Sequence, residues 1–368
     1  MTNRRKFIKQ VAAAGIAGSM PSVLFSQQKP AKNMIWAGLL HLSYNMWEDR
    51  VPSKYKDENY NYATCQEAWE WAHPYRPFLT FDEPTWNALL REMASAGMNM
   101  VVIDVGDGIQ YESHPEISVR HAWTHEKLRS ELVKMRKMGL EPIPKMNFAA
   151  SHDIWLGEYS RMVSTKKYYE VCRNLIHEVC SLFDRPRFFH LGMDEETAQH
   201  QRRLDYAVMR QNDLWWHDFY FLVDEVEKNN VRPWVWSDYA WNHAEMFFKK
   251  MPRSVLQSNW YYGSNFEVGA DADQLKGKDL FSLSGDERRQ IYVNLYNQLE
   301  AHGYDQIPTG SNHGNDENMA LTAEYCRGII DPARLLGFMN VPWRPTLPPC
   351  LDRHKEAIAQ MGRIIKNF

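Results

Sequence analysis

The sequence lacks any strong imbalance of charge. Its 368 residues include 43 lysines and arginines and 46 aspartates and glutamates, for a net charge of −3. A protein that binds nucleic acid usually neutralises phosphates with a basic surface, and no long run of one sign occurs here. The composition therefore predicts no nucleic-acid partner. The chain is long enough for one large domain with an ample core.

Cysteine is scarce. The five cysteines (Cys65, Cys172, Cys180, Cys326 and Cys350) do not have the spacing of metal ligands. Cys172 and Cys180 lie eight residues apart on one predicted helix, too far along its axis to bond each other. An odd count leaves at least one free thiol, and we expect buried, unpaired cysteines. We also expect neither a metal nor another cofactor.

A membrane-spanning run is missing as well. Residues 11–25 are apolar but short and rich in alanine and glycine, and they follow the paired Arg4 and Arg5. This pattern is typical of a twin-arginine export signal, and no cysteine follows it for a lipid anchor. Residues 1–33 are therefore interpreted as a signal and short linker. We expect a bacterial periplasmic or extracellular protein with no stable membrane insertion after signal removal. The alternative is an amphipathic N-terminal helix.

No glycine-rich phosphate loop follows any predicted strand, which argues against a dinucleotide-binding open sheet. What is present is a regular alternation of strands and helices without an internal linker. Eight such pairs predict a single-domain (β/α)₈ TIM barrel over residues 34–368, with an insertion at about 41–79. The predicted strands are 35–40, 100–104, 141–146, 188–191, 233–236, 255–257, 305–308 and 335–339. The predicted helices are 82–95, 124–138, 168–183, 213–229, 245–250, 288–302, 317–327 and 353–365.

Polar and aromatic residues follow nearly every predicted strand, at the end where barrels build their active sites. Together they predict a polar pocket with aromatic walls, of the kind that holds a sugar ring. In chain order these residues are His41, Tyr44 and Asn45; Asp104 and Asp107; Asn147, His152 and Asp153; Asp194 and Glu195; Asp238; Asn259, Trp260, Tyr261 and Tyr262; Asn312 and His313; Asn340 and Trp343.

The stretch from Arg187 to Glu196 is the most informative of these. It is an apolar strand that breaks at Gly192 and then presents Asp194 and Glu195. Adjacent carboxylates at this point indicate acid catalysis or metal binding. The alternative is a solvated helix N-terminus, where acids are favoured by the helix dipole.

The segment from Phe189 to Glu195 resembles the His-x-Gly-Gly-Asp-Glu motif of glycoside hydrolase family 20, the β-N-acetylhexosaminidases. The order of neighbouring features is also similar, over roughly residues 35–343. Residues 151–155 resemble the family's Pro-Gly-His segment, and residues 105–108 fall where the family has an Asp-rich loop. Residues 233–238 and 257–260 resemble its two Trp-bearing strands.

The resemblance implies an exported, retaining glycosidase that removes a β-linked N-acetylhexosamine or related terminal sugar. Glu195 would be the general acid, with a pKa raised by burial, and Asp194 would orient the substrate's 2-acetamido group, which acts as the internal nucleophile. Because the two residues are adjacent, their side chains would point in different directions. The implied carbohydrate-binding residues are His41, Asp107, His152, Trp236, Asp238, Trp260, Tyr261, Tyr262, Asn312 and Trp343.

The sequence also departs from the family pattern. The first strand lacks the family's sugar-gripping arginine, Met193 replaces the second glycine of the motif, and no acid follows Trp343. Two other functions therefore stay open. One is a metal-dependent isomerase, epimerase or lyase that uses His41, Asp107, His152, Glu195 and His313 for Mn²⁺ or Zn²⁺. The other is a catalytically silent carbohydrate-binding protein.

Overall fold

The computed structural model describes residues 34–270, 272–275 and 277–368. The predicted signal segment lies outside these residues. Residues 33–368 form one compact unit.

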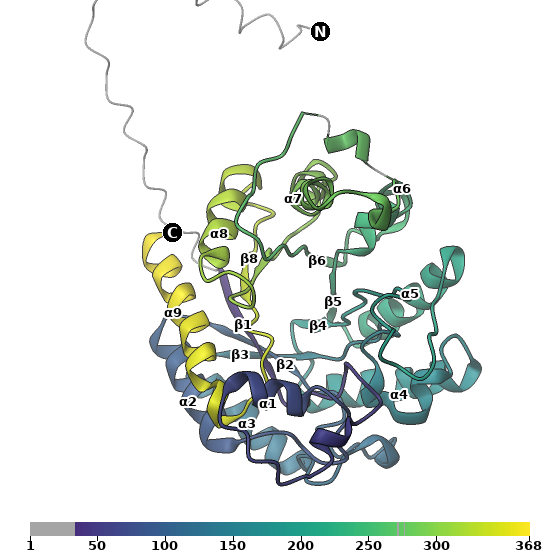
Figure 1. Ribbon diagram of the computed structural model, residues 1–368, viewed down its shortest axis with the longest axis vertical. Coiled ribbons are helices and arrows are strands. Elements are labelled where there is room, and N and C mark those ends of the chain that lie inside the picture. The colour runs from purple at the N-terminus through teal and green to yellow at the C-terminus, as the bar shows by residue number, and fades with distance from the viewer. Residues whose placement is uncertain (1–33, 271, 276) are drawn as a thin grey trace, which may run out of the picture. The chain divides into compact units, whose positions relative to one another are not determined.

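Eight parallel strands form the centre of the described chain (Figure 1). They are β1 (Ile35–His41), β2 (Met100–Asp104), β3 (Glu141–Lys145), β4 (Phe188–His190), β5 (Arg232–Trp236), β6 (Leu256–Ser258), β7 (Thr309–Gly310) and β8 (Gly337–Asn340). Their order is β6-β5-β4-β3-β2-β1-β8-β7. Parallel bridges from Gln257 to Gln306 and from Trp260 to Thr309 join the two ends. The predicted (β/α)₈ barrel is therefore confirmed.

Helices surround the strands (Figure 1). They are α1 (Cys65–Ala72), α2 (Glu83–Ser95), α3 (His125–Lys137), α4 (Lys166–Leu182), α5 (Asn212–Glu227), α6 (Tyr239–Lys250), α7 (Gly285–Ala301), α8 (Asn318–Ile329) and α9 (Leu351–Asn367). Several begin at a side chain that accepts a hydrogen bond from the first turn, as Asp82 does for α2 and Thr124 for α3. Within the described part of the chain, no helix has the length and apolar character needed to cross a bilayer.

The seventh strand was predicted at the wrong residues. Residues 305–308 contain only an isolated bridge at Gln306, and the regular strand is Thr309–Gly310. Pro308 has no N–H to donate to a ladder, so regular pairing begins after it. Two helices also differ. The sixth begins at Tyr239 rather than at 245, and the insertion contains α1, which the sequence did not predict.

Two apolar layers position the strand ends. Alternate strand residues such as Leu39, Val102 and Met339 contact one another and fill the barrel interior. The opposite strand faces pack against the helices in a larger cluster. A third cluster joins the insertion to the segment after β8 through Tyr44, Trp71, Leu347 and others. The insertion is therefore packed onto the barrel.

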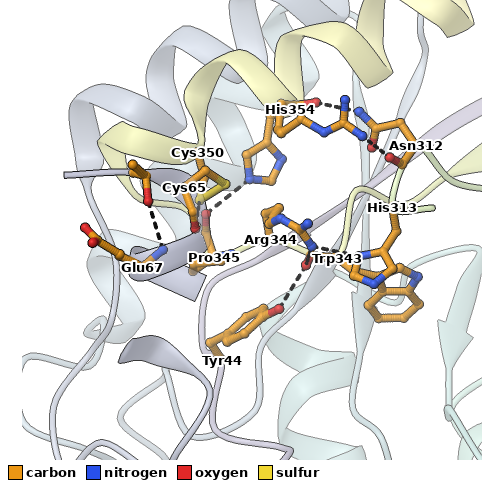
Figure 2. Close-up of a disulfide and its surroundings, with 12 residues drawn as sticks. Tyr44, Cys65, Glu67, Asn312, His313, Trp343, Arg344, Pro345, Cys350 and His354 are labelled. Atoms are coloured by element: carbon orange, nitrogen blue, oxygen red, sulfur yellow. Dashed lines mark hydrogen bonds between the residues drawn. A yellow bond between two sulfur atoms is a disulfide. The ribbon is translucent and has the colours of Figure 1, made fainter. Parts of the chain in front are cut away.

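A disulfide between Cys65 and Cys350 strengthens this attachment (Figure 2). It links the start of α1 to the residue before α9, 285 positions apart in sequence. The expectation of buried, unpaired cysteines holds for Cys172, Cys180 and Cys326 and is wrong for this pair. The sequence positions of Cys65 and Cys350 gave no sign of this disulfide, because only the folded barrel brings the two residues together.

We expect the Cys65→Ser/Cys350→Ser double variant to lose about 4 kcal/mol of unfolding free energy, because a long loop is no longer closed in the unfolded chain. Denaturant titration of both proteins, with and without dithiothreitol, measures the loss. The reductant should destabilise only the parent. Equal stability of parent and variant without reductant would contradict the prediction.

Candidate active site

The backbone of the turn after β4 is left-handed at three residues in and beside the acidic pair. Gly192, Met193 and Glu195 have φ angles of 71°, 73° and 54°. A left-handed backbone costs a residue with a side chain about 1–2 kcal/mol. Strain of this kind persists only where surrounding contacts enforce it, and it is concentrated at functional sites. At Met193, where the family motif has a glycine, the side chain is buried in the core, which offsets the cost.

Asn147, just after β3, enforces the turn. Its side-chain oxygen accepts hydrogen bonds from the backbone N–H groups of Met193 and Ala149, each at 3.1 Å. Its amide nitrogen donates to Oδ1 of Asp194 at 2.7 Å. A Cβ atom on Gly192 would lie 2.0 Å from the Asn147 oxygen. Glycine is required at 192 because Asn147 occupies the space beside it.

The side chains of Asp194 and Glu195 have different neighbours. Asp194 is buried against Asn147, with Oδ2 3.6 Å from Nε2 of His152. Glu195 lies between two histidines, at 3.2 Å from Nε2 of His152 and 3.3 Å from Nε2 of His200. Its side chain is 23% exposed, which leaves Glu195 the more accessible of the two acids.

The histidines reverse the predicted pKa of Glu195. Burial alone would raise it, but the hydrogen bonds and charges of His152 and His200 outweigh burial and hold the pKa below its ordinary value. Burial would likewise lower the pKa of His152, yet Asp194 and Glu195 raise it. The predicted raised pKa of Glu195 is therefore corrected, since this arrangement places the proton on His152.

Asp238, at the end of β5, is the third carboxyl of the site. Its Oδ2 accepts the backbone N–H of Glu195 at 2.9 Å. Its Oδ1 is buried and has no hydrogen-bond partner among the described residues. Burial first, and then the charge of Asp194, raise the pKa of Asp238 well above its ordinary value. Burial and this charge therefore favour the neutral form of Asp238, whose Oδ2 supports the strained turn.

Glu196 has a structural part in the same turn. It is paired with the buried Arg210 and accepts the backbone N–H of Ala150 at 3.1 Å. Arg210 in turn donates to the backbone oxygen of Phe148 at 2.6 Å. These contacts tie the loop after β4 to the loop after β3. The sequence left the role of Glu196 open.

Aromatic side chains lie beside the acids. The ring of Trp47 contacts His152 at 4.9 Å and Trp343 at 6.0 Å between centroids, and Trp343 lies 6.1 Å from Trp236. The indole N–H of Trp343 donates to the hydroxyl of Tyr262 at 3.0 Å. Tyr262 stacks on Trp260 at 5.1 Å, and His41 lies 5.9 Å from Trp343.

Several polar atoms of this wall have no partner within the described residues. They include Nε1 of Trp47, Nε1 of Trp236 and Nε2 of His41. A buried donor without a partner is costly. The wall therefore offers hydrogen-bonding groups that suit the hydroxyls of a polar ligand.

Three residues predicted to bind substrate have other partners. The carboxylate of Asp107 accepts hydrogen bonds from Ser43 and Asn45 and is buried, which raises its pKa to about 7. The ring of Tyr261 lies against Phe266. Asn312 donates to the backbone oxygen of Arg353 in α9. Among the described residues, none of the three has a hydrogen bond, ion pair or ring contact with Asp194 or Glu195, and their role in substrate binding stays a prediction.

Asn147 was predicted to line the pocket without a stated role, and two residues of the site, His200 and Trp47, were missed. Asn147 had a usable signal, since it is the first polar residue after β3. His200 and Trp47 come from irregular loops, and nothing in their sequence spacing indicates that they reach the acids.

A cavity of about 580 Å³ adjoins Glu195. Its walls come from the turn after β4, the start of α5 and the start of α6, with Trp215 and Tyr239 among the aromatic residues. Asp238 also lines it. Glu195 can therefore address a group bound in this cavity while Asp194 stays buried beside Asn147.

The set of residues predicted for a metal does not assemble. His41 lies 3.6 Å from Asp104, Asp107 is held by Ser43 and Asn45, and His313 contacts Arg344. A smaller group remains, because ligand atoms of His152, Asp194 and Glu195 lie within 4.8 Å of one another. These three are the residues that could hold a cation.

Comparison with known proteins supports the fold. No family profile and no curated sequence matches this chain. Solved structures are similar to it, and many are from glycoside hydrolase family 20. The chitobiase of Flavobacterium johnsoniae is 17% identical with a TM-score of 0.52, over 76% of this chain and 46% of that one. A β-N-acetylhexosaminidase of Streptomyces coelicolor A3(2) is 11% identical with a TM-score of 0.54, over 90% and 64%.

An exo-β-N-acetylglucosaminidase of Vibrio harveyi, solved with N-acetylglucosamine, is 11% identical with a TM-score of 0.53. The match covers 89% of this chain and 54% of that one. The chain thus spans about half to two thirds of the length of these structures. At sequence identities of 11–17%, the similarity to these structures shows a shared fold. The resemblance predicted from residues 189–195 is confirmed at that level.

We expect Gly192→Ala to destabilise the protein more than Gly139→Ala. Both glycines have positive φ, but an added Cβ at Gly139 meets nothing within 4 Å. The control should lose about 1 kcal/mol from backbone strain, and Gly192→Ala about 1–3 kcal/mol more from the clash with Asn147. Urea unfolding compares the two. Equal losses would contradict the role given to Asn147.

The His152–Glu195 pair predicts a pH window for stability. Because the pKa of His152 is raised in the folded protein, protonated His152 stabilises the fold at pH below 6.5, the ordinary histidine pKa. This stabilisation is lost as the pH rises through the raised pKa. A lowered carboxyl pKa stabilises above 4.5 and is lost as pH falls through the lowered value. Melting temperatures of the parent and His152→Gln should therefore differ most between about pH 4.5 and 6.5. A difference that does not shrink at pH 9 would contradict the pairing.

Proposed function

We propose that the protein is an exported glycoside hydrolase that removes a β-linked N-acetylhexosamine, or a related terminal sugar, from an oligosaccharide or glycoconjugate. The observation that carries the proposal is the strained turn after β4. It holds Asp194 against Asn147 and leaves Glu195 facing a cavity. The fold shared with family 20 structures supports the same assignment.

In the proposed reaction, Glu195 gives a proton to the glycosidic oxygen as the bond from C1 to that oxygen breaks. The carbonyl oxygen of the substrate's own 2-acetamido group attacks C1 from the other side. Asp194 accepts the acetamido N–H and stabilises the positive charge that develops there. Water then opens the cyclic intermediate, with Glu195 taking a proton back, so the configuration at C1 is retained.

The proton for the first step is already in the site. The charges around His152 favour its imidazolium form and the Glu195 carboxylate. A sugar that enters the site displaces water from the pair, and loss of solvation favours the neutral forms. The proton then moves from Nε2 of His152 to Glu195 over their 3.2 Å contact. Nε2 of His200 lies 3.3 Å from the other oxygen of Glu195.

The terminal sugar would lie against Trp236 and Trp343, with Trp260 and Tyr262 behind them. The leaving group would occupy the cavity beside Glu195, which these four residues do not line. Flat apolar faces suit the C–H side of a sugar ring, and the unpartnered nitrogens of Trp47, Trp236 and His41 suit its hydroxyls. The Vibrio harveyi structure, which shares the fold, was solved with N-acetylglucosamine. This supports a sugar of that class here.

Export through the twin-arginine route is part of the proposal. It rests on Arg4 and Arg5 before a short apolar run. The disulfide between Cys65 and Cys350 also fits an oxidising compartment, since disulfides are rare in the bacterial cytosol.

A metal-dependent reaction is the second candidate, favoured by the donor atoms of His152, Asp194 and Glu195 within 4.8 Å. Elemental analysis of the purified protein separates the two. A stoichiometric ion whose removal abolishes turnover would favour this second candidate.

We expect Glu195→Gln to lower the hydrolysis of 4-nitrophenyl N-acetyl-β-glucosaminide or N-acetyl-β-galactosaminide by about 100-fold to 10,000-fold, because the general acid is lost. Glu92→Gln, on the exposed face of α2, is the matched control and should keep parental turnover. Near-parental turnover by Glu195→Gln would refute the proposal. Absence of turnover by the parent on all such glycosides would favour a silent carbohydrate-binding protein.

We expect Asp194→Asn to lower kcat on the acetamido substrates by about 100-fold with a smaller change in KM, since it acts on charge that develops in the transition state. The parent should not cleave the matching glucoside, which lacks the internal nucleophile. Equal turnover of glucoside and acetamido glycoside would contradict the assisted mechanism.

A further inference from the structure

The cavity beside Glu195 continues into a second cavity along α6. This second cavity has a volume of about 970 Å³ and lies between α6, the start of α5 and the end of α7. Asn242, His243 and Gly277 line both cavities. The two cavities therefore form one continuous groove, called here the α6 groove. Since a cavity of about 300–1,000 Å³ already accommodates a drug-sized ligand, the α6 groove offers more room than a small leaving group needs.

Aromatic rings line both parts of the α6 groove. In the first cavity, Tyr239 stacks on Trp215 at 3.9 Å between ring centroids and contacts His243 at 4.6 Å. In the second cavity, Phe248 stacks on His302 at 4.0 Å. His243 and His302 are exposed, and Tyr239 and Phe248 are half-buried. Each cavity thus presents a pair of rings that are held by stacking and keep accessible surface, which suits the flat C–H face of a sugar.

Phe281 is a further aromatic side chain on the wall of the first cavity. Its side chain is 59% exposed and lines this cavity. The turn that carries it is anchored, because the adjacent Leu280 is buried in the core and the carboxylate of Asp279 accepts the backbone N–H of Phe281 at 3.1 Å. An anchored turn holds the exposed ring at the cavity. A sugar in the first cavity can therefore cover the ring of Phe281 and remove its apolar surface from water.

The polar lining of the α6 groove favours a neutral chain of sugars. Lys278 and Asp279 line the first cavity, and Glu245 and Lys249 line the second, so neither sign of charge prevails. The amide of Asn242, which lines both cavities, offers a donor and an acceptor, as sugar hydroxyls require. An extended peptide commonly pairs with an exposed sheet edge, whereas the strands of this barrel pair with one another. A glycan fits this groove better than a peptide or a lipid.

We propose that the α6 groove binds the leaving-group part of the substrate as a chain of at least two sugars. The inference rests on the proposed glycosidase function. The first sugar of the leaving group lies beside Glu195 and against Phe281, and the second lies on the stacked rings of Phe248 and His302. The preferred substrate is therefore a neutral oligosaccharide of three or more sugars, from whose end one sugar is removed. A conjugate with a small leaving group fills only the first cavity.

The test measures kcat/KM on β-1,4-linked N-acetylglucosamine oligomers of two to five sugars. A dimer places one sugar in the groove and a trimer two, so kcat/KM should rise about tenfold from dimer to trimer as a second ring is covered. Phe281→Ala should lower kcat/KM about tenfold on every oligomer, because the first sugar loses an apolar contact. His302→Ala should lower the ratio of trimer to dimer. Val133→Ala, an exposed side chain of α3, is the control and should keep the parental values.

Two results would overturn the inference. One is an equal kcat/KM of the parent for dimer and trimer, since the second cavity then adds nothing to binding. The other is a higher kcat/KM for a serine peptide that carries a single β-linked N-acetylglucosamine than for any oligomer, because the groove would then bind a peptide chain.

A binding measurement separates the groove from the reaction. In calorimetric titration, Glu195→Gln should bind the trimer about tenfold more tightly than N-acetylglucosamine, and Glu195→Gln/Phe281→Ala should lose most of this difference. Such binding, with no turnover of any oligomer or aryl glycoside by the parent, would refute the proposed function and leave the groove. Turnover of aryl glycosides by the parent, with equal binding of trimer and monosaccharide by both variants, would refute the groove and leave the proposed function.

Discussion

The contact on which the site depends is that between Asn147 and the turn after β4. The side-chain oxygen of Asn147 accepts hydrogen bonds from two backbone N–H groups, and its side-chain nitrogen donates to Asp194. A side chain after β3 therefore fixes the carboxylate after β4. The same contact excludes any Cβ at Gly192. The buried ion pair between Glu196 and Arg210 also helps to hold the two loops together. Because barrel strands are rigid and parallel, the loops at the carboxyl ends of β3 and β4 can together hold a strained turn that neither would keep alone.

This rigidity has an electrostatic consequence. Three carboxyl groups, Asp194, Glu195 and Asp238, lie together in a largely buried place, and three negative charges there would repel one another strongly. His152 faces two of these carboxyl groups, and the raised pKa of Asp238 favours its neutral form. The result is a site that already contains movable protons. In the proposed reaction, the Glu195 carboxyl, whose pKa is low in the resting protein, takes up the proton when a ligand excludes water from the pair.

The insertion between β1 and α2 gives the site its outer wall. It supplies Trp47 and Trp69, and the disulfide from Cys65 to Cys350 holds it against the loop after β8 that carries Trp343 and Arg344. Two segments almost 300 residues apart in sequence thus form one rim of aromatic and cationic groups. Covalent attachment matters here, because α1 is only eight residues long and would be marginal without tertiary support.

The sequence by itself determined the fold class and the acids. Alternating apolar segments with polar ends predicted the barrel, and the break at Gly192 before Asp194 and Glu195 marked the turn that we propose to be catalytic, because these signals are local. Only the tertiary structure decided the protonation of that turn, since His152 and His200 lie in separate loops and reversed the predicted pKa of Glu195. It also placed Asn312 against Arg353, paired Cys65 with Cys350, and left Arg344 with no carboxylate partner among the described residues. Each of these depends on contacts between residues distant in the chain, which no local pattern of residues records.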